Sequence, residues 1–406
     1  MSILSFFNGT FCGKEQIIKE ISQTHGLRMV SDIDLIQEAS RMSQIPERKI
    51  SRAFMEKASV FNKFTHEKER SVAYLRLALA RALSEADFLV DGFSSILIPS
   101  PLTHVLKICL IADMASRVSR AAQEKQISEK EAAAQVRRDD EIAGAWCDSL
   151  FKIQDPWDPS LYDIIIPTDK MGPKDVVALV SENLKNEVIK PTRSSQKAAV
   201  DFLLAAEVEV ALVKEGHAVG VSARDGLVTL TIHNNVLLLG RLEEELKTIV
   251  SRVEGVETVE TRIGKGFYQT DIYRKFDFQV PSKVLLVDDE REFVQTLSER
   301  LQMRDVGSAI AYDGESALSL VAEDEPDVMI LDLKMPGIDG IEVLKKVKAS
   351  RPNIEVIILT GHGSEADRDI CMNLGAFAYL QKPVDIDELS RLLKEANQKI
   401  REGKEA

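Results

Sequence analysis

The chain has 406 residues, which exceeds one typical domain core and predicts two to four domains. Its net charge of −13 argues against a general nucleic-acid surface, which requires clustered lysine and arginine. No apolar run approaches the roughly 20 residues of a membrane helix, and we expect no signal peptide. The four scattered cysteines lack metal-ligand spacing and are typical of reduced thiols. We therefore expect a cytoplasmic α/β multidomain protein without membrane contact or a nucleic-acid partner.

Residues 1–190 alternate strand and helix signals, which predict a parallel sheet with covering helices. The apolar run 3–8 leads through a glycine-bearing loop into the periodic helical segment 15–25. The later elements are predicted as strands at 87–93, 105–112 and 163–168, and one charged helical stretch at 114–146.

The loop at 8–15 has part of the pattern of a phosphate-binding loop. In such loops glycine backbones surround phosphate oxygens, a lysine meets the outer phosphates and a hydroxyl meets Mg²⁺. Gly9, Gly13 and Lys14 are present, but bulky residues occupy the loop and Glu15 stands at the hydroxyl place. A tight turn with a solvated lysine is the alternative interpretation.

The whole of 1–190 resembles the cytidylate-kinase-like family of nucleoside monophosphate kinases. The motifs that carry the resemblance are MVSDIDLIQEA, DFLVDGF and WDPSLYDIIIPTDKMGPKDVVALV. It implies a P-loop-kinase-like α/β domain that could take ATP or another nucleotide. The candidate nucleotide-binding residues are Gly9, Gly13, Lys14, Arg117, Arg137 and Arg138.

Two departures from the family pattern indicate a degenerate domain. Phe93 stands where relatives often carry an arginine next to the substrate. After Arg137 and Arg138 no arginine follows at the lid position, and such an arginine can supply several orders of magnitude in rate. Whether the domain is an enzyme stays open, and we favour a kinase-like binding module without turnover. A solvated helix face is the alternative interpretation of these arginines.

Residues 191–266 predict a small α+β domain. A helical run is followed by two strands around Asp225-Gly226, a hairpin signal, and then by a helix and a last strand at 258–263. The motifs DGLVTL and EGVETV make this segment similar to a BON domain, which implies a scaffold or partner-binding role. The stretch 267–282 is expected to be a linker.

Residues 283–406 form the last predicted domain, with five strands and five helices expected within 283–382. Asp288 and Asp289 end one buried strand and Asp332 ends another. Because parallel strands bring their carboxyl ends to one edge, these acids should share one crevice. Clustered carboxylates require a divalent ion, and an all-oxygen set suits Mg²⁺ or Mn²⁺.

Thr360 and Lys382 each end a further strand, and phosphoryl transfer needs such a hydroxyl and such a cation. With these residues the segment resembles the flavodoxin-like, doubly wound (βα)5 receiver domain of response regulators. The resemblance implies that Asp332 is phosphorylated, that Asp288, Asp289 and Asp332 hold Mg²⁺, and that Lys382 binds phosphate. It also makes Thr360 and Tyr379 switch residues, and Lys382-Pro383 a cis peptide.

The sequence thus predicts a two-component phosphorelay response regulator. A sensor histidine kinase or phosphotransfer protein would phosphorylate Asp332, and the kinase-like and BON-like segments would signal to an unidentified output protein. A homodimer through the receiver is left open. The alternative function is a receiver-gated nucleoside monophosphate kinase that uses ATP. Lys334 and His362 lie where receivers tune dephosphorylation, in a direction that the sequence does not reveal.

Overall fold

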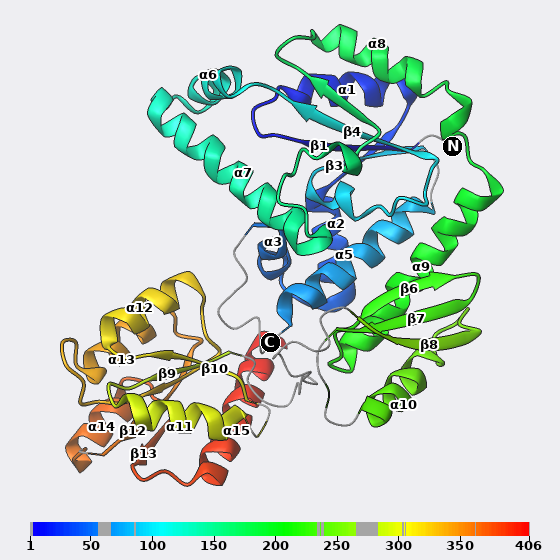
Figure 1. The fold of residues 1–406 in the computed structure, drawn as a ribbon. Helices are drawn as coiled ribbons and strands as arrows, with labels where there is room; N and C mark the ends of the chain where they lie inside the picture. Colours follow the sequence, from blue (N-terminus) through cyan, green and yellow to red (C-terminus); the bar gives the residue numbers. More distant parts are fainter. Residues whose placement is uncertain are drawn as a thin grey trace. The chain divides into compact units, whose positions relative to one another are not determined.

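The structure is a computed structural model that describes residues 3–55, 66–84, 87–233, 236, 239–264, 283–302, 304, 306–361 and 363–405. The described helices and strands form two compact units, one before and one after the predicted linker (Figure 1). That linker, 267–282, lies outside the described residues. The predicted boundary between 190 and 191 falls inside the first unit. It stays a prediction.

The first unit contains a parallel five-stranded sheet in the order β2-β3-β1-β4-β5. The strands are β1 (Ile3–Asn8), β2 (Arg28–Ser31), β3 (Phe88–Asp91), β4 (Val105–Ile111) and β5 (Ile164–Pro167). Successive side chains of a strand point to opposite faces, so Ile3 and Phe7 enter one apolar core and Leu4 and Phe6 the other. A sheet buried on both faces explains why these strands read as continuous apolar runs.

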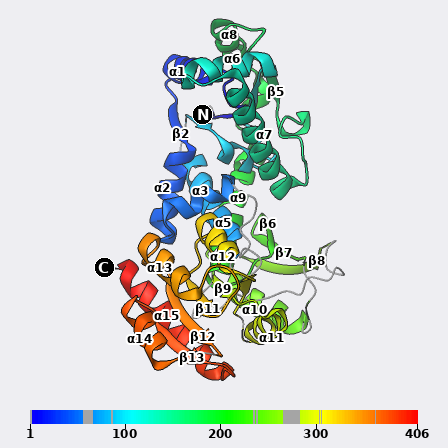
Figure 2. The same ribbon diagram turned by 90° about the vertical axis from the view of Figure 1, so that its left-hand side faces the viewer.

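Helices cover both faces of this sheet (Figures 1 and 2). They are α1 (Lys14–His25), α2 (Asp32–Ser43), α3 (Glu47–Met55), α5 (Glu67–Leu83), α6 (Met114–Lys125), α7 (Glu129–Phe151) and α8 (Pro173–Asn183), with short 3-10 helices η1 (Phe93–Leu97), η2 (Pro159–Leu161) and η3 (Glu187–Ile189). Helices α1 and α8 pack on one face, and α2, α3, α5 and α7 on the other.

The predicted helical stretch 114–146 consists of two helices, with a short break between them. Gln126 adopts a left-handed conformation (φ 54°) that ends α6. Ser128 then starts α7 through a capping box with Glu131, in which each side chain accepts the other residue's backbone N–H.

The middle segment belongs to the first unit and packs on its apolar core through a long helix. Its elements are α9 (Arg193–Lys214), β6 (Gly220–Arg224), β7 (Leu227–Ile232), α10 (Leu239–Val250) and β8 (Thr258–Ile263). Helix α9 adds Ala206 and Val210 to the core that contains α5. The predicted hairpin is confirmed: β6 and β7 pair antiparallel, and Asp225 (φ 49°) and Gly226 (φ 78°) form the turn.

The second unit is a parallel sheet in the order β10-β9-β11-β12-β13, which confirms the doubly wound fold class. Its elements are β9 (Val284–Val287), α11 (Arg291–Gln302), β10 (Ser308–Ala311), α12 (Gly314–Glu323), β11 (Val328–Leu331), α13 (Gly340–Ser350), β12 (Glu355–Thr360), α14 (Glu365–Asn373), β13 (Ala378–Gln381) and α15 (Ile386–Glu405). Helices α12 and α13 cover one face and α11 and α15 the other. The fifth helix begins at Ile386, beyond the predicted range 283–382.

Across the described residues, no helix has both the length and the apolarity needed to cross a membrane.

Candidate functional site

Three acidic side chains meet at the carboxyl edge of the second unit's sheet. Asp288 and Asp289 follow β9, and Asp332 follows the neighbouring strand β11. One carboxylate oxygen from each lies within 4.8 Å of the other two. Asp288 and Asp332 are buried, whereas Asp289 is half-buried, so the cluster opens toward solvent on one side. The sequence predicted this juxtaposition from the strand ends alone.

Lys382 reaches into the acidic cluster from the end of β13. Its Nζ lies 2.7 Å from Asp288 Oδ2, 2.8 Å from Glu290 Oε1 and 3.8 Å from Asp332 Oδ2. The ammonium group also stands 4.4 Å from the centre of the Phe293 ring, in a cation–π contact. Burial disfavours the charge, but the hydrogen bonds to Asp288 and Glu290 outweigh it and raise the pKa of Lys382.

The cluster keeps a surplus of negative charge even with the lysine in place. Burial and the nearby Asp332 together raise the pKa of Asp288, although Lys382 opposes them. One ammonium group therefore does not neutralise Asp288, Asp289 and Asp332. An all-carboxylate set with surplus charge suits a hard divalent cation such as Mg²⁺.

Asp332 is held in place by the backbone that follows it. The Leu333 N–H donates to Asp332 Oδ1 at 2.8 Å, which leaves Oδ2 on the side of Lys382. Gly340 lets the following loop close on the strand end, because a Cβ there would lie 2.2 Å from the Asp332 carbonyl oxygen. Only glycine avoids that clash. The exposed Lys334 lies two residues after Asp332, and His362 lies outside the described residues.

The two predicted switch residues lie on neighbouring strands beside a glycine. Thr360 ends β12 and is fully buried, and Tyr379 belongs to β13. A Cβ at Gly363 would lie 1.6 Å from Tyr379 Oη and 2.9 Å from Thr360 Cγ2. The Tyr379 hydroxyl is buried without a hydrogen-bond partner among the described residues, and burial raises the pKa of Tyr379.

The sequence reasoning missed Glu290, Phe293 and Gly363. Glu290 and Phe293 follow the predicted acidic pair on a loop and the first turn of α11, where no periodic signal marks them. The second glycine after Thr360, in the string TGHG, was the available sign of Gly363.

The candidate phosphate-binding loop lies at the carboxyl end of β1, between β3 and β4, where strand order reverses. Gly13 is left-handed (φ 72°) and precedes Lys14, the first residue of α1. Lys14 Nζ lies 3.0 and 2.8 Å from the two carboxylate oxygens of Asp91, which ends β3. The lysine that would meet phosphate is thus paired with an acid from the same chain.

Arg117 occupies the inside of the same loop. Its guanidinium donates to the Thr10 carbonyl at 2.8 Å and to both Asp140 oxygens at 2.9 and 2.6 Å, and only 5% of the residue is exposed. Its Cζ stands 3.1 Å from where a Cβ on Gly9 would lie. The loop therefore holds a neutralised arginine where a phosphate would have to enter.

The other predicted arginines lie elsewhere on the first unit. Arg137 and Arg138 are exposed on α7, and Arg138 donates to Gln135 on the same helix at 3.1 Å. No contact between described residues joins them to Lys14. Arg137 lies beside Asp140, the partner of Arg117, and its own role in nucleotide binding stays a prediction.

Phe93 belongs to the apolar core and not to a substrate surface. Its ring packs edge-on against Phe7 and is stacked with Phe54, at centroid distances of 5.7 and 5.9 Å. Trp146 Nε1 donates to the Phe93 carbonyl at 3.0 Å. Aromatic side chains fill the place where the resemblance expects a substrate arginine.

Comparison with known proteins agrees with this two-part organisation. Residues 284–394 match the response regulator receiver domain family. The second unit is a response regulator receiver domain. Residues 4–170 match the cytidylate kinase-like family, which confirms the resemblance of the first unit. The likeness of the middle segment to a BON domain stays a prediction.

Individual response regulators are also similar in sequence to this chain, over about the length of the receiver domain. The response regulator MprA of Mycolicibacterium vanbaalenii is 34% identical over 110 residues, 27% of this chain and 48% of that protein. The transcriptional regulatory protein CpxR of Escherichia coli is 44% identical over 108 residues, 27% of this chain and 46% of that protein. The chain spans about half the length of the curated relatives it matches.

Solved receiver structures are similar too. A CheY-like receiver domain protein from Methanospirillum hungatei is 26% identical, with a TM-score of 0.29, and the match covers 30% of this chain and 97% of that one. A receiver domain protein from Clostridium thermocellum is 34% identical, with a TM-score of 0.29, over 29% of this chain and 96% of that one.

Proposed function

We propose that this chain is a phosphorelay response regulator in which Asp332 accepts a phosphoryl group from a sensor histidine kinase or phosphotransfer protein. The observation that carries the proposal is the clustering of Asp288, Asp289 and Asp332 within 4.8 Å, with Lys382 Nζ beside them. Phosphoryl transfer relies mainly on positioning and charge neutralisation, and this cluster supplies the groups for both.

Asp288, Asp289 and Asp332 would hold the divalent ion, which neutralises phosphoryl oxygens when bound. Asp332 Oδ2 is the nucleophile, because Oδ1 already accepts the Leu333 N–H. A bond forms between Oδ2 and phosphorus while the bond from phosphorus to the donor histidine nitrogen breaks. The imidazole keeps that electron pair, and Lys382 turns from Asp288 and Glu290 toward the new phosphoryl oxygens.

The response to phosphorylation would pass through Thr360 and Tyr379. Thr360 ends the strand next to Asp332's strand, so its hydroxyl lies on the edge where the phosphoryl group arrives. Movement of Thr360 changes the space beside Gly363, which Tyr379 Oη occupies. Such a change is a shift between two receiver states, and it repacks the surface around β13.

We further propose that the kinase-like unit acts as a partner-binding output without phosphotransfer activity. Lys14 is paired with Asp91, Arg117 is paired with Asp140, and Phe93 is in the core. ATP could bind the loop only if these ion pairs opened. The middle segment would serve as scaffold in the same output.

The output partner is proposed to be a protein. Some relatives are named transcriptional regulators, but the matches to them cover 27% of this chain, and the kinase-like match covers a separate region. The net charge of −13 for the whole chain does not favour a general nucleic-acid surface. An electrophoretic mobility shift of the full chain on random duplex DNA at low salt would contradict this part of the proposal.

The phosphorelay is tested by incubating the full chain with acetyl phosphate and Mg²⁺ and measuring intact mass. Wild type should gain one phosphoryl group, and Asp332→Asn should gain none. Asp339→Asn is the matched control, because asparagine also caps helices and Asp339 lies at the start of α13, outside the acidic cluster. An unphosphorylated wild type, or a phosphorylated Asp332→Asn, would rule out the proposed acceptor.

The output proposal needs a second assay, of ATP-dependent phosphorylation of CMP and other nucleoside monophosphates. We expect no turnover with or without phosphorylation of the receiver. Turnover that disappears in Lys14→Met would establish the alternative, a receiver-gated kinase, and leave the role of Asp332 intact.

A further inference from the structure

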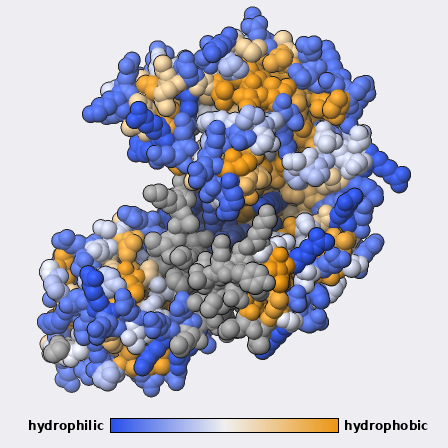
Figure 3. Space-filling model, viewed as in Figure 1, coloured by the Kyte–Doolittle hydropathy of each residue, from blue (hydrophilic) through white to orange (hydrophobic). Residues whose placement is uncertain are grey.

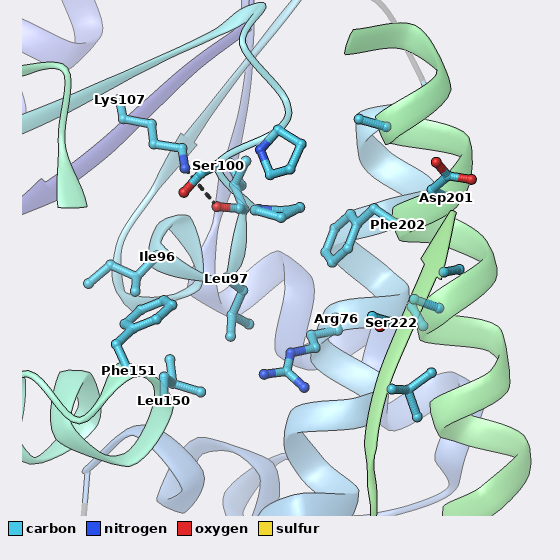
Figure 4. Close-up of a pocket in the computed structure, with 18 of the residues that line it drawn as sticks. Arg76, Ile96, Leu97, Ser100, Lys107, Leu150, Phe151, Asp201, Phe202 and Ser222 are labelled. Carbon is cyan, nitrogen blue, oxygen red and sulfur yellow. Dashed lines mark hydrogen bonds between the residues drawn. The ribbon is translucent and has the colours of Figure 1, made fainter. Parts of the chain in front are cut away.

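A cavity of about 800 Å³ lies in the first unit between the sheet and the helix α9 with strand β6 (Figure 4). Ser5 of β1 and Lys107 of β4, which are partners in the strand register, lie at its base. The phosphate-type loop follows Asn8, three residues further along β1. None of Gly9, Lys14 and Arg117 lines the cavity. Its volume is within the range of about 300–1,000 Å³ typical of ligand pockets.

Lys107 stands where the strand pattern requires an apolar residue. Val105, Lys107 and Cys109 alternate onto one face of β4, and Val105 and Cys109 are buried in the core there. Strand β4 is internal, between β1 and β5, in a sheet covered on both faces. A lysine at such a position breaks the apolar pattern, and breaks of that kind are expected at functional sites.

Among the described residues, the Lys107 ammonium group has one hydrogen-bond partner. Nζ donates to the Ile98 carbonyl at 2.8 Å, and no carboxylate of the described residues lies within 4.0 Å of it (Figure 4). Desolvation by burial lowers the pKa of Lys107. An ammonium group has three N–H donors, so this lysine can still bind an anion in the cavity.

The other charges that line the cavity are mostly balanced. Arg76 Nη1 is 2.7 Å from Glu209, and Lys197 pairs with Asp225 at the exposed edge. Among the described lining cations, only Lys107 and the exposed Arg224 lack a carboxylate within 4.0 Å. The inner end of the cavity therefore has a positive charge without a salt-bridge partner among the described residues, and Asp163, which accepts the Lys107 backbone N–H at 2.8 Å, offsets it only from beyond 4.0 Å.

The walls around this charge are apolar. Phe202 reaches from α9 toward the cavity, and Ile96, Leu97 and Phe151 lie on the facing side (Figure 4). Phe151 is 43% exposed at the end of α7. In the space-filling view apolar residues gather on the face of this unit between α7 and α9 (Figure 3).

We propose that this cavity binds an organic acid whose anionic group contacts Lys107 and whose aliphatic or aromatic body lies between Phe202 and Ile96. A half-buried cation at the base and apolar walls around it recognise that chemistry. A polar sugar or a polyphosphate would bury polar groups against these walls without hydrogen-bond partners. Because the lining residues come from both the kinase-like core and α9 with β6, the ligand would fasten the middle segment to the core. This site does not depend on the phosphorelay.

The test uses 8-anilinonaphthalene-1-sulfonate, an aromatic anion that fluoresces when it leaves water, with decanoate as competitor. Wild-type full chain should bind one equivalent, and decanoate should displace it. Lys107→Met keeps the side-chain length and removes the charge, and it should weaken binding by about tenfold or more, the effect of one charge-assisted hydrogen bond. Lys174→Met, on the exposed face of α8 and outside the cavity lining, is the matched control and should bind like wild type.

A third variant keeps the test decisive if Lys107→Met fails to fold. Ala205→Phe on α9 fills the cavity with Lys107 intact, and it should abolish binding while the far-ultraviolet circular dichroism is unchanged. The proposal is overturned if wild type shows no saturable, decanoate-sensitive binding. It is equally overturned if folded Lys107→Met and folded Ala205→Phe both bind like wild type.

Discussion

The two parallel five-stranded sheets place basic and acidic groups at the same kind of position, but the ratio of positive to negative charge differs between them. In the receiver, Asp288, Asp289 and Asp332 form one cluster, and Lys382 contacts Asp288 and Asp332 of it. In the kinase-like unit, Lys14 is matched by its own carboxylate from the sheet edge. Both arrangements lie at the carboxyl ends of parallel strands beside a point where strand order reverses.

The comparison indicates how a site that can bind a ligand, the acidic cluster of the receiver, differs from a site whose charges are already paired, the loop of the kinase-like unit. A surplus of buried charge can be relieved by an incoming ion or group, so the receiver cluster favours Mg²⁺ and a phosphoryl group. A balanced pair must be broken before a ligand binds, and that energy opposes binding. The buried pair of Arg117 and Asp140 is the clearest such barrier, with side chains 6% and 25% exposed.

The largest expected effect comes from removing Lys382, the lysine that pairs with the receiver's acidic cluster. Lys382→Met should lower the rate of phosphorylation by acetyl phosphate by about 10²-fold or more, because a preorganised donor to the phosphoryl oxygens is lost. Mg²⁺ should bind at least as tightly as in wild type, since the acids lose a competing positive charge. Phosphorylation is followed by intact mass, and Mg²⁺ binding by calorimetry.

Lys346→Met on the exposed face of α13 is the matched control for Lys382→Met. Its phosphorylation rate and its Mg²⁺ affinity should equal those of wild type. Lys346 pairs only with Glu342 on its own helix, at 3.7 Å. If Lys382→Met lost Mg²⁺ binding together with phosphorylation, the lysine would be a structural support of the acids and the surplus-charge argument would be wrong.

A smaller effect is expected from removing the negative charge that pairs with Arg117 at the loop of the kinase-like unit. Asp140→Asn leaves Arg117 buried with a weaker partner and should lower the free energy of unfolding by about 2 kcal/mol. Pyrophosphate should bind the variant more tightly than wild type and restore part of that stability, because it supplies the missing negative charge. Denaturant unfolding can be followed by tryptophan fluorescence, since both tryptophans, Trp146 and Trp157, lie in the first unit.

Asp139→Asn, one residue earlier on α7, is the control for Asp140→Asn. Asp139 accepts a hydrogen bond from Gln135 on its own helix, and its replacement should change stability and pyrophosphate binding little. Equal pyrophosphate affinity in wild type and Asp140→Asn would mean that the ion pair does not block the loop.

The receiver site was largely predictable because its chemistry is local to strand ends. Asp288 and Asp332 each follow four buried residues, and a buried parallel strand is a strong sequence signal. The way that Lys382 divides its contacts between Asp288 and Glu290 was not predictable, since Glu290 lies 92 residues earlier on a loop.

The closure of the kinase-like loop was harder to predict, because its counter-ions are distant in sequence. Asp91 is 77 residues from Lys14 and Asp140 is 23 residues from Arg117, and no pattern marks either pair. Other features left a readable sign. The capping box at Ser128 predicts the break between α6 and α7, and the alternation in VLKICLI puts Lys107 on a core face.

The smallest effects concern the predicted switch position, where the hydroxyl of Tyr379 is buried without a hydrogen-bond partner among the described residues. Tyr379→Phe removes that hydroxyl and should leave stability unchanged or raise it by up to about 1 kcal/mol. Gly363→Ala should destabilise the receiver by about 1–3 kcal/mol, because its Cβ would lie 1.6 Å from Tyr379 Oη. In the Tyr379→Phe background this loss should shrink by about 1 kcal/mol, since the two changes share one contact.

Calorimetry of the full chain measures these changes in stability. The unfolding transition of the receiver is recognised as the one that Mg²⁺ shifts. Gly361→Ala is the control, because a Cβ there meets only the flexible Lys382 side chain at 3.8 Å or more. A loss for Gly363→Ala that is the same with tyrosine and with phenylalanine at 379 would show that Tyr379 does not occupy the space beside Thr360. The proposed response to phosphorylation would then need another route from Thr360 to the surface around β13, because the proposal makes Tyr379 the residue that connects them.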